Sequence, residues 1–263
     1  MRLCKSLIAI FLALISNCMS AQDTLWIVRG EWTHIPDSVQ AIRFNSSADW
    51  SGINATLSRA SDESTSLVVV NTDSLSHTWK LHVDEEEEWA IEAFDTLTFE
   101  IPALPIGTYL FGLTDEIGRV LGASGQSQVG LGVEFPLFHW NLGDWSVQRM
   151  ASANMGVPVA WEEPYVPEQF TINERTYPAT VDDPEALVAM NLGDTCWISI
   201  ANHGFMDHVF HFHGFHVIMV SSTHHPERVG WSKDTVPIRM GEGLAVQLVA
   251  NQMGMYPVHH HNL

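Results

Sequence analysis

Short apolar runs rich in β-branched residues recur along almost the whole chain, and turn-forming Gly, Pro, Asn and Asp residues separate them. No segment keeps a helical period over a dozen residues. Many short strands at near-regular spacing are typical of β-sandwiches. We therefore predict strands over residues 25–29, 39–44, 66–71, 96–101, 108–113, 136–140, 170–172, 186–190, 197–201, 209–220, 236–240 and 245–250.

The number of strands and the length of 263 residues together predict two domains. We expect an all-β protein of two Greek-key β-sandwich domains in series. The predicted boundaries are residues 1–21 for a leader, 22–125 for the N-terminal domain and 126–263 for the C-terminal domain. The glycine-rich segment 122–133 is the best candidate for a linker, and the irregular segment 144–167 is interpreted as a long connecting loop.

The first residues have the organisation of a secretory signal peptide. Arg2 and Lys5 precede an apolar run from Leu7 to Ile15, and small residues follow at Ser20-Ala21. The apolar run is too short to span a bilayer, so we predict no membrane span and a secreted or periplasmic protein. A lipid anchor at Cys18 is the alternative, but Asn17 fits a lipobox poorly, and we favour cleavage after Ala21.

Charge narrows the possible partners. The chain has 31 acidic residues against 12 Lys and Arg, for a net charge of −19. Such a charge repels nucleic acid and anionic membranes and attracts cations, so the expected partner is a metal ion and not nucleic acid. The acidic run from Asp84 to Glu88 is interpreted as solvated surface in preference to a weak cation-binding patch. Cys196 is the cysteine that remains once the predicted leader is removed, and we expect it to be a buried thiol on a strand.

Histidine is concentrated near the C-terminus: ten of the fourteen histidines lie from His203 onward. Imidazole is a common ligand of copper and zinc, and a metal site needs several such groups at one place. Two spaced clusters make a metal site the leading hypothesis, and they are His208-Val-Phe-His211-Phe-His213 and His259-His260-His261.

The alternation of side chains along a strand gives these clusters a geometry. On a strand from Asp207 to Val220, His211 and His213 share one face and His208 lies on the other. In the second cluster the outer histidines share a face, and the middle one is opposite. If the two strands are neighbours, the first face collects His211, His213, His259 and His261, and the second brings together His208 and His260.

The pattern resembles the last domain of multicopper oxidases, in which an H-x-x-H-x-H strand and an H-C-H strand serve two kinds of copper centre. Further similarity lies in Gly193-Asp194, Asp234-Thr-Val, the run from Val249 to Gly254 and the segment from Phe170 to Pro178. The resemblance implies a plastocyanin-like, or cupredoxin, fold with copper as the cofactor and zinc as an alternative. It implies that a trinuclear cluster takes His211, His213, His259 and His261, and a mononuclear copper takes His208.

The sequence also departs from that family. His260 stands where the family has cysteine, so a blue, thiolate-bound copper is excluded there. A further histidine expected four residues beyond His261 lies past Leu263. No H-x-H pair precedes His203; the earlier histidines are His34, His77, His82 and His139. A homo-oligomer or a second chain is therefore the expected source of the missing ligands.

Two functions follow. The first is a secreted copper-binding protein of the multicopper oxidase type, a copper-dependent oxidoreductase with an incomplete set of copper sites. The second is a non-catalytic copper- or zinc-binding cupredoxin module, or a structural β-sandwich. Whether the chain is an enzyme stays open at this point, and no catalytic residue is assigned. The other histidines are interpreted as core or surface residues: His77, His82, His203, His216, His224 and His225.

Overall fold

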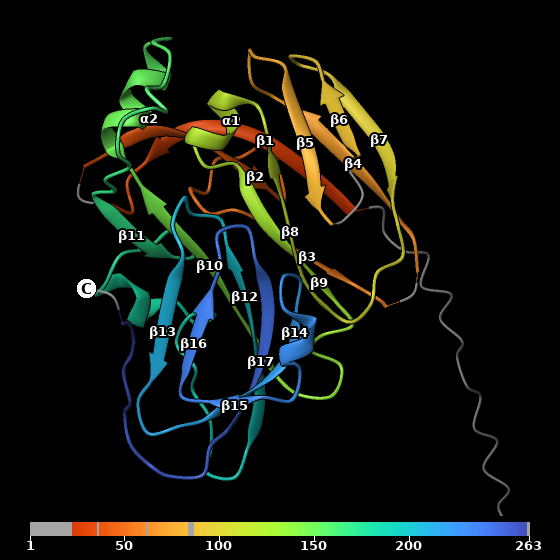
Figure 1. The fold of residues 1–263 in the computed structure, drawn as a ribbon. Helices are drawn as coiled ribbons and strands as arrows, with labels where there is room; N and C mark the ends of the chain where they lie inside the picture. Colours follow the sequence, from red (N-terminus) through yellow and green to blue (C-terminus); the bar gives the residue numbers. More distant parts are fainter. Residues whose placement is uncertain (1–22, 36, 62, 84–86, 262–263) are drawn as a thin grey trace, which may run out of the picture.

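The chain forms two β-sandwiches in series, as the apolar pattern predicts (Figure 1). The computed structural model describes residues 23–35, 37–61, 63–83 and 87–261. The predicted signal peptide, with Cys18, lies outside the described residues. Within the described part, no helix is long and apolar enough to cross a membrane. Helices are short: α1 spans Glu116–Val120 and α2 spans Val147–Asn154.

The N-terminal sandwich packs a four-stranded sheet against a five-stranded sheet. The first has the order β2-β1-β4-β7 and the second the order β3-β9-β8-β5-β6. Their strands are β1 (Asp23–Trp32), β2 (Val39–Asn45), β3 (Thr56–Arg59), β4 (Thr65–Asn71), β5 (His77–His82), β6 (Glu88–Ile91), β7 (Thr96–Ile101), β8 (Gly107–Leu113) and β9 (Ser124–Val129).

The C-terminal sandwich has the sheet orders β11-β10-β12-β17-β14-β15 and β16-β13-β18. Two 3₁₀ helices, η1 (Ala179–Asp182) and η2 (Pro226–Arg228), lie in its connections. Its strands are β10 (Leu137–Trp145), β11 (Gln169–Ile172), β12 (Thr195–Asn202), β13 (His208–Phe212), β14 (Val217–Ser222), β15 (Ser232–Lys233), β16 (Thr235–Ile238), β17 (Gly243–Val249) and β18 (Val258–His260).

The two sandwiches repeat one arrangement. β1 pairs with β4 in parallel and with β2 antiparallel, and β10 pairs in the same way with β12 and β11. Asn71 ends β4, and its side-chain amide donates to the carbonyls of Leu75 and Glu92. Asn202 ends β12 and donates equivalently to Met206 and Arg239. Each asparagine precedes a buried histidine at the start of the next strand, so the repeat sets the position of that histidine.

Four local expectations were wrong. The strand predicted over residues 186–190 does not form; this segment is a turn followed by irregular backbone. The predicted strand from Asp207 to Val220 is two strands in different sheets, because the chain turns at Gly214 with a positive φ of 74°. The predicted linker 122–133 contains β9, which pairs with β3 and β8 of the N-terminal sandwich. We therefore propose to place the domain boundary between β9 and β10. The expected loop 144–167 contains α2, capped by the Ser146 side chain.

Separate apolar cores hold the two sandwiches. The N-terminal core surrounds Trp79, which is fully buried and stacks on Phe111 at 5.8 Å between ring centroids. The C-terminal core includes Trp140, stacked on Phe212 at 5.9 Å. Cys196 is a buried strand residue of this core, as predicted, and burial raises the pKa of its thiol to about 12. Both cores lie between sheets and position the strands that carry the histidines.

A buried polar chain connects the sandwiches. Thr108 on β8 and Ser199 on β12 approach to 2.6 Å between their hydroxyl oxygens. Ser199 donates to the Gln126 carbonyl oxygen, and Gln126 donates to Asn141 at 3.0 Å. The chain ends at His203, whose Nε2 is 3.2 Å from the Asn141 oxygen. Each buried polar group needs a partner, so this network fixes how the two sandwiches meet.

His77 at the start of β5 is a structural residue. Its buried imidazole lies 3.1 Å from both Asp73 and Asp115, and Arg29 completes the group at 2.7 Å from Asp73. Burial alone disfavours the imidazolium, but the hydrogen bonds with Asp115 and Asp73 outweigh it and raise the pKa of His77 to about 9. His77 is thus a buried residue held by two carboxylates, in line with its interpretation as a core residue.

This group gives stability that depends on pH. Because the folded pKa of His77 is about 9, above the value of about 6.5 for an unfolded histidine, its contribution is complete below pH 6.5 and is lost as the pH rises through 9. We expect the free energy of unfolding in urea to fall by about 2–3 kcal/mol between about pH 6 and pH 10. His77→Gln should flatten that slope, and an unchanged slope in the variant would contradict the assignment.

Candidate metal centre

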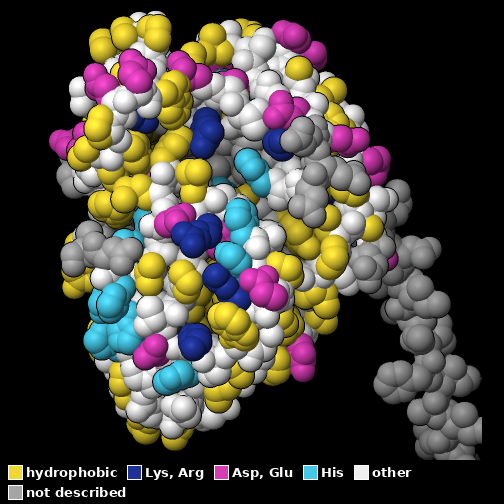
Figure 2. Space-filling view, in the orientation of Figure 1, with side chains coloured by type: hydrophobic (Ala, Val, Ile, Leu, Met, Phe, Trp, Pro, Cys, Tyr) yellow, Lys and Arg dark blue, Asp and Glu magenta, His cyan; other side chains and the backbone are white. Residues whose placement is uncertain are grey.

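The two histidine clusters lie on neighbouring strands. β13 and β18 pair antiparallel, with His211 opposite His259 and Phe210 opposite His260. The backbone N–H of His261 donates to Val209 at 2.7 Å, which continues the pairing beyond β18. The condition set by the strand-parity argument is therefore met. The cluster lies at the edge of the C-terminal sandwich, near the described end of the chain (Figures 1 and 2).

Four imidazoles gather on one face. The ring centroids of His211 and His213 are 4.7 Å apart, and those of His213 and His259 are 4.9 Å apart. His261 lies 5.9 Å from His211 and 6.5 Å from His259. We call His211, His213, His259 and His261 the four-histidine cluster. The structure brings together all four residues that the sequence placed on this face.

Hydrogen bonds fix the proton on two of these rings. The Thr235 hydroxyl donates its one proton to Asp234 at 3.1 Å. It can therefore only accept a hydrogen bond from His211 Nδ1, which lies 3.1 Å from the same hydroxyl oxygen. His259 Nδ1 lies 2.9 Å from the His260 carbonyl, which can only accept. Both rings therefore carry their proton on Nδ1 and keep a lone pair on Nε2. Metal-binding histidines are oriented by contacts of this kind.

His213 and His259 meet through the nitrogens that a metal would use. Their Nε2 atoms are 2.8 Å apart. Since His259 has its lone pair on Nε2, the His213 nitrogen must hold a proton between them; two facing lone pairs would repel. A metal ion replaces such a proton when imidazole becomes a ligand. This pair is thus the point of the cluster best prepared for a cation.

The cluster is open and does not close around one point. His213, His259 and His261 are exposed, and His211 is half-buried. Among the described residues, no set of three or more His, Cys, Asp or Glu side chains is placed to hold one metal ion by itself. Four ligands that converge only pairwise fit a site shared over several ions, or one that rearranges or is completed by other ligands.

His208 has a partner that the sequence analysis missed. The Asp144 carboxylate, fully buried at the end of β10, lies 3.1 Å from His208 Nε2. It also accepts the backbone N–H groups of Phe205 and Met206 at 2.8 and 3.2 Å. A Cβ on Gly204 would collide with the same carboxylate, which explains the glycine there. Asp144 therefore orients His208 and the loop before it.

His260 lies beside His208. The two rings are 5.0 Å apart, and both ring nitrogens of His260 are buried without a hydrogen-bond partner among the described residues. Burial, followed by the neighbouring His208, lowers the pKa of His260. A buried imidazole without partners is costly, and such a group in a native protein calls for a ligand or another explanation. The predicted pair of His208 and His260 is brought together, with Asp144 next to it.

Replacing His260 by phenylalanine tests whether those nitrogens are unpaired in the metal-free protein. Its ring packs against Phe210 at 6.1 Å, so an apolar ring of similar shape fits. We expect His260→Phe to raise the free energy of unfolding by about 1 kcal/mol, because unpaired buried donors and acceptors are removed. Urea unfolding in the presence of a chelator measures this. The exposed neighbour provides the control, His261→Phe, and a destabilised H260F protein would contradict the prediction.

The remaining histidines lie apart from this cluster. His139 approaches Glu185 at 3.3 Å, and the exposed His216 lies between β13 and β14. The surface interpretation of His203 was wrong, because it ends the buried polar chain and is half-buried. His203 lines a cavity between the sandwiches together with His82 and His224. Sequence alone gave no signal for that grouping, because the three residues come from different strands and loops.

Comparison with known proteins agrees with this geometry. Residues 161–263 match the family model described as multicopper oxidase. This part of the chain carries both histidine clusters and is similar to the multicopper oxidase family, and copper is the cofactor that this similarity implies. None of the curated protein sequences matches the chain.

Solved structures extend the similarity to the N-terminal half. A blue copper oxidase from Nitrosomonas europaea aligns with a TM-score of 0.73 at 22% identity, over 91% of this chain and 78% of that one. A multicopper oxidase aligns at 0.71 and 16%, over 91% and 82%. A copper nitrite reductase from Nitrosomonas europaea aligns at 0.69 and 14%, over 91% and 87%. At these identities they establish the fold, two cupredoxin-like sandwiches.

The four-histidine cluster has ligands suited to copper, whereas the pair of His208 and His260 does not suit a blue copper. Imidazole nitrogens are good ligands for copper, and the hydrogen bonds of His211 and His259 leave Nε2 free for it. At His208 and His260 the thiolate of a blue centre is absent, and His208 is already bonded to Asp144. These residues do not fit a blue copper. The orphaned His260 nitrogens leave a minor copper or zinc site there as a prediction.

Proposed function

We propose that this protein is an exported copper-binding protein of the multicopper oxidase type. Copper is held by His211, His213, His259 and His261, and bound copper supplies one-electron redox chemistry. The chain acts as a copper-dependent oxidoreductase only with ligands from a second copy or another chain. Export is supported by the signal-peptide pattern of residues 1–21.

One observation carries this proposal. Two rings of the four-histidine cluster have their Nδ1 proton held by Thr235 and by the His260 carbonyl. His224 and His225 have similar contacts, but only in the four-histidine cluster, among the described residues, do two such rings lie beside each other, at 5.7 Å between the centroids of His211 and His259. Orientation of the ring and selection of the tautomer are what a metal ligand requires from its surroundings. The chain supplies both before any metal is present.

The rest of the chain supports a limited role. His77, at the place in β5 that corresponds to His208 in β13, is engaged with Asp73 and Asp115. His82 lies on the cavity between the sandwiches. Neither adds to the four-histidine cluster, and His260 removes the thiolate through which electrons enter in the family. A partner's ligands are therefore part of the oxidoreductase proposal.

A non-catalytic metal-binding module is the second candidate. It is favoured by the 3.1 Å contact of His208 with Asp144, which uses the histidine that a mononuclear copper would need. In this reading copper or zinc stays at the exposed cluster, and no electron-transfer route exists. Imidazole ligands accept both metals, and the affinity order favours copper when both are available.

A substitution at Thr235 tests whether its hydrogen bond with His211 contributes to copper binding. Thr235→Val keeps the shape of the side chain but removes the acceptor for His211 Nδ1. We expect copper affinity to fall by about tenfold, since partners behind a ligand contribute about 10–100-fold. Competition titration against a chromogenic chelator measures the change. Thr223→Val, which removes a hydroxyl next to His224 instead, should leave the affinity unchanged; an equal loss in both variants would argue against the role of Thr235.

Metal content per chain tests the function itself. The mature protein is loaded with copper, desalted, and analysed for copper together with its oligomeric state. One or two coppers per chain support the binding module. Three or more, together with oxygen consumption in the presence of an electron donor, support shared ligands and the oxidoreductase. A protein that retains no copper would overturn the proposal and leave the histidines as structural residues.

A further inference from the structure

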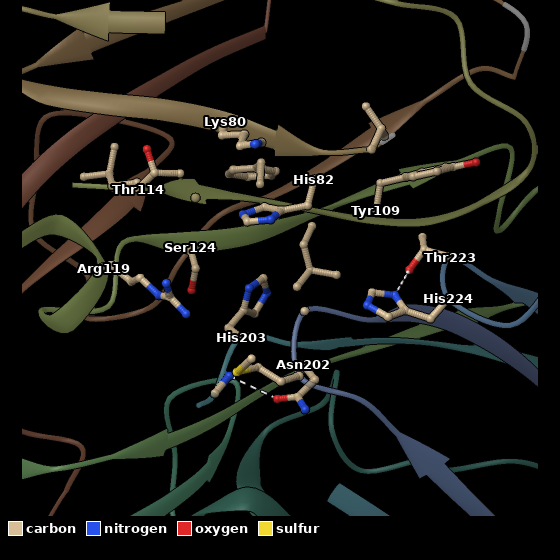
Figure 3. A pocket seen from close by; sticks show the side chains of 18 of the residues that line it. Lys80, His82, Tyr109, Thr114, Arg119, Ser124, Asn202, His203, Thr223 and His224 are labelled. Atoms are coloured by element: carbon tan, nitrogen blue, oxygen red, sulfur yellow. Dashed lines mark hydrogen bonds between the residues drawn. The ribbon is translucent and has the colours of Figure 1, made fainter. Parts of the chain in front are cut away.

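A large cavity lies between the two sandwiches, away from the four-histidine cluster. Its volume is about 830 Å³, within the range of small-molecule sites. Lys80 and His82 on β5 and Arg119 on α1 line one side. His203 after β12 and His224 after β14 line the other. Figure 3 shows these side chains directed into one space from both halves of the molecule.

The charge of this cavity is opposite to that of the protein. The whole chain has 31 acidic and 12 basic residues. No Asp or Glu belongs to the described lining, whereas two of the basic residues and three histidines do. On the surface, His and basic side chains gather over the junction between the sandwiches (Figure 2). A concave site with positive walls concentrates anions even on an acidic protein.

Arg119 is available to a ligand. Among the described residues it forms no ion pair, and its guanidinium lies over the Phe205 ring at 4.8 Å. Stacking of this kind orients the planar group and leaves its N–H donors free. The half-buried Lys80 is 3.7 Å from the exposed Glu88, a long contact for an ion pair. Arginine with free donors binds carboxylate and phosphate groups in a bidentate manner.

The histidines add donors without adding carboxylates. His82 is exposed at the end of β5; the surrounding protein, then the charges of Lys80 and Arg119, lower its pKa. Burial and the nearby His82 lower the pKa of His203 to about 3. Both rings are therefore neutral near pH 7. A neutral imidazole can donate one N–H to an anion, and the approach of an anion favours its protonated form.

Apolar walls complete the site. The exposed Pro102 and Pro105 and the half-buried Tyr109 line the cavity. An inorganic ion alone would leave these surfaces in contact with water. Apolar and aromatic walls with a few convergent polar groups are typical of sites for small organic molecules.

We propose that this cavity is a binding site for a small organic anion, in which a carboxylate or phosphate group is joined to an aromatic or aliphatic body. Arg119 and Lys80 bind the anionic group, and His82 and His203 line its approach. Tyr109 and the neighbouring prolines contact the body of the ligand. The site is independent of the copper proposal, since none of its residues belongs to the four-histidine cluster.

Calorimetric titration of the full chain, treated with a chelator, tests this site. Benzoate is the organic probe and inorganic phosphate the second probe. We expect benzoate to bind with a Kd below about 1 mM and phosphate to bind more weakly. Arg119→Gln should weaken benzoate binding by about tenfold or more, and Arg119→Lys should weaken it less. Arg228→Gln is the matched control, because Arg228 also stacks on an aromatic ring, that of Trp231, outside the cavity.

The outcomes separate the alternatives. Benzoate binding that is lost in R119Q and kept in R228Q supports the proposal. Binding of phosphate alone overturns its organic part and leaves an inorganic oxyanion site. Absence of binding for both probes, or equal binding by wild type and R119Q, overturns the site. Circular dichroism of R119Q establishes that the variant is folded, and Lys80→Gln gives a second variant from another strand.

Discussion

Replacing His211 and His213 together with alanine should abolish tight copper binding. His211 has its tautomer set by Thr235, and His213 shares the 2.8 Å nitrogen contact with His259. Removing both takes away one of the two strands of ligands. Loss of a single supporting partner behind a ligand costs about 10–100-fold, so loss of two ligands should exceed about 100-fold. Copper titration with mass spectrometric metal analysis measures the effect.

The control must remove the same number of imidazoles elsewhere. His77 is unsuitable, because it holds Asp73 and Asp115 together in the N-terminal sandwich. His216→Ala with His225→Ala is the matched double variant, since neither residue contacts the cluster. Copper content that is unchanged in the His211 and His213 variant would show that the site lies elsewhere.

Asp144→Ala should destabilise the fold by about 3 kcal/mol. The carboxylate is fully buried and accepts two backbone N–H groups besides its contact with His208. Removing it leaves these donors without partners, and each hydrogen bond to a charged group contributes about 1.5–3 kcal/mol. The backbone donors can be satisfied in part by water that enters the space, which keeps the expected loss near the lower end of their sum.

Urea unfolding of three proteins measures this loss. Asp144→Asn keeps the shape and one acceptor oxygen, so it should be less destabilising than the alanine variant. Asp194→Ala is the control, because Asp194 is exposed and accepts from Asn191 at the surface; a cost below about 1 kcal/mol is expected there. Equal stability of D144A and D194A would show that Asp144 does not organise this corner.

The internal repeat is visible in the sequence as an equal spacing between an asparagine and a histidine in the two sandwiches. Val-Val-Val-Asn71 is followed six residues later by His77, and Ser-Ile-Ala-Asn202 by His208. Both asparagines donate to backbone carbonyls of the following loop and of a neighbouring strand. The shared spacing was a signal that His77 and His208 are equivalent. The spacing does not predict that the two histidines have different acidic partners, because those partners come from other segments of the chain.

The alternation of side chains along a strand is a local property, so the sequence alone determines the features that follow from it. Many of the strands, the two sandwiches, and the common face of His211, His259 and His261 follow from apolar periodicity and residue spacing. The same reasoning wrongly predicted β13 and β14 as one strand. The chain turns at Gly214, and the alternation of faces does not continue through that turn. His213 stays with the cluster because it follows directly after β13.

Long-range packing decided the rest. Asp144 meets His208 across 64 residues of chain, and no local pattern encodes that approach. The cavity between the sandwiches takes Arg119 from a helix, His82 from a strand and His224 from a turn. Such groupings depend on how two independent cores dock, through buried contacts such as that between Thr108 and Ser199. Tertiary structure alone placed these charges and imidazoles around one space.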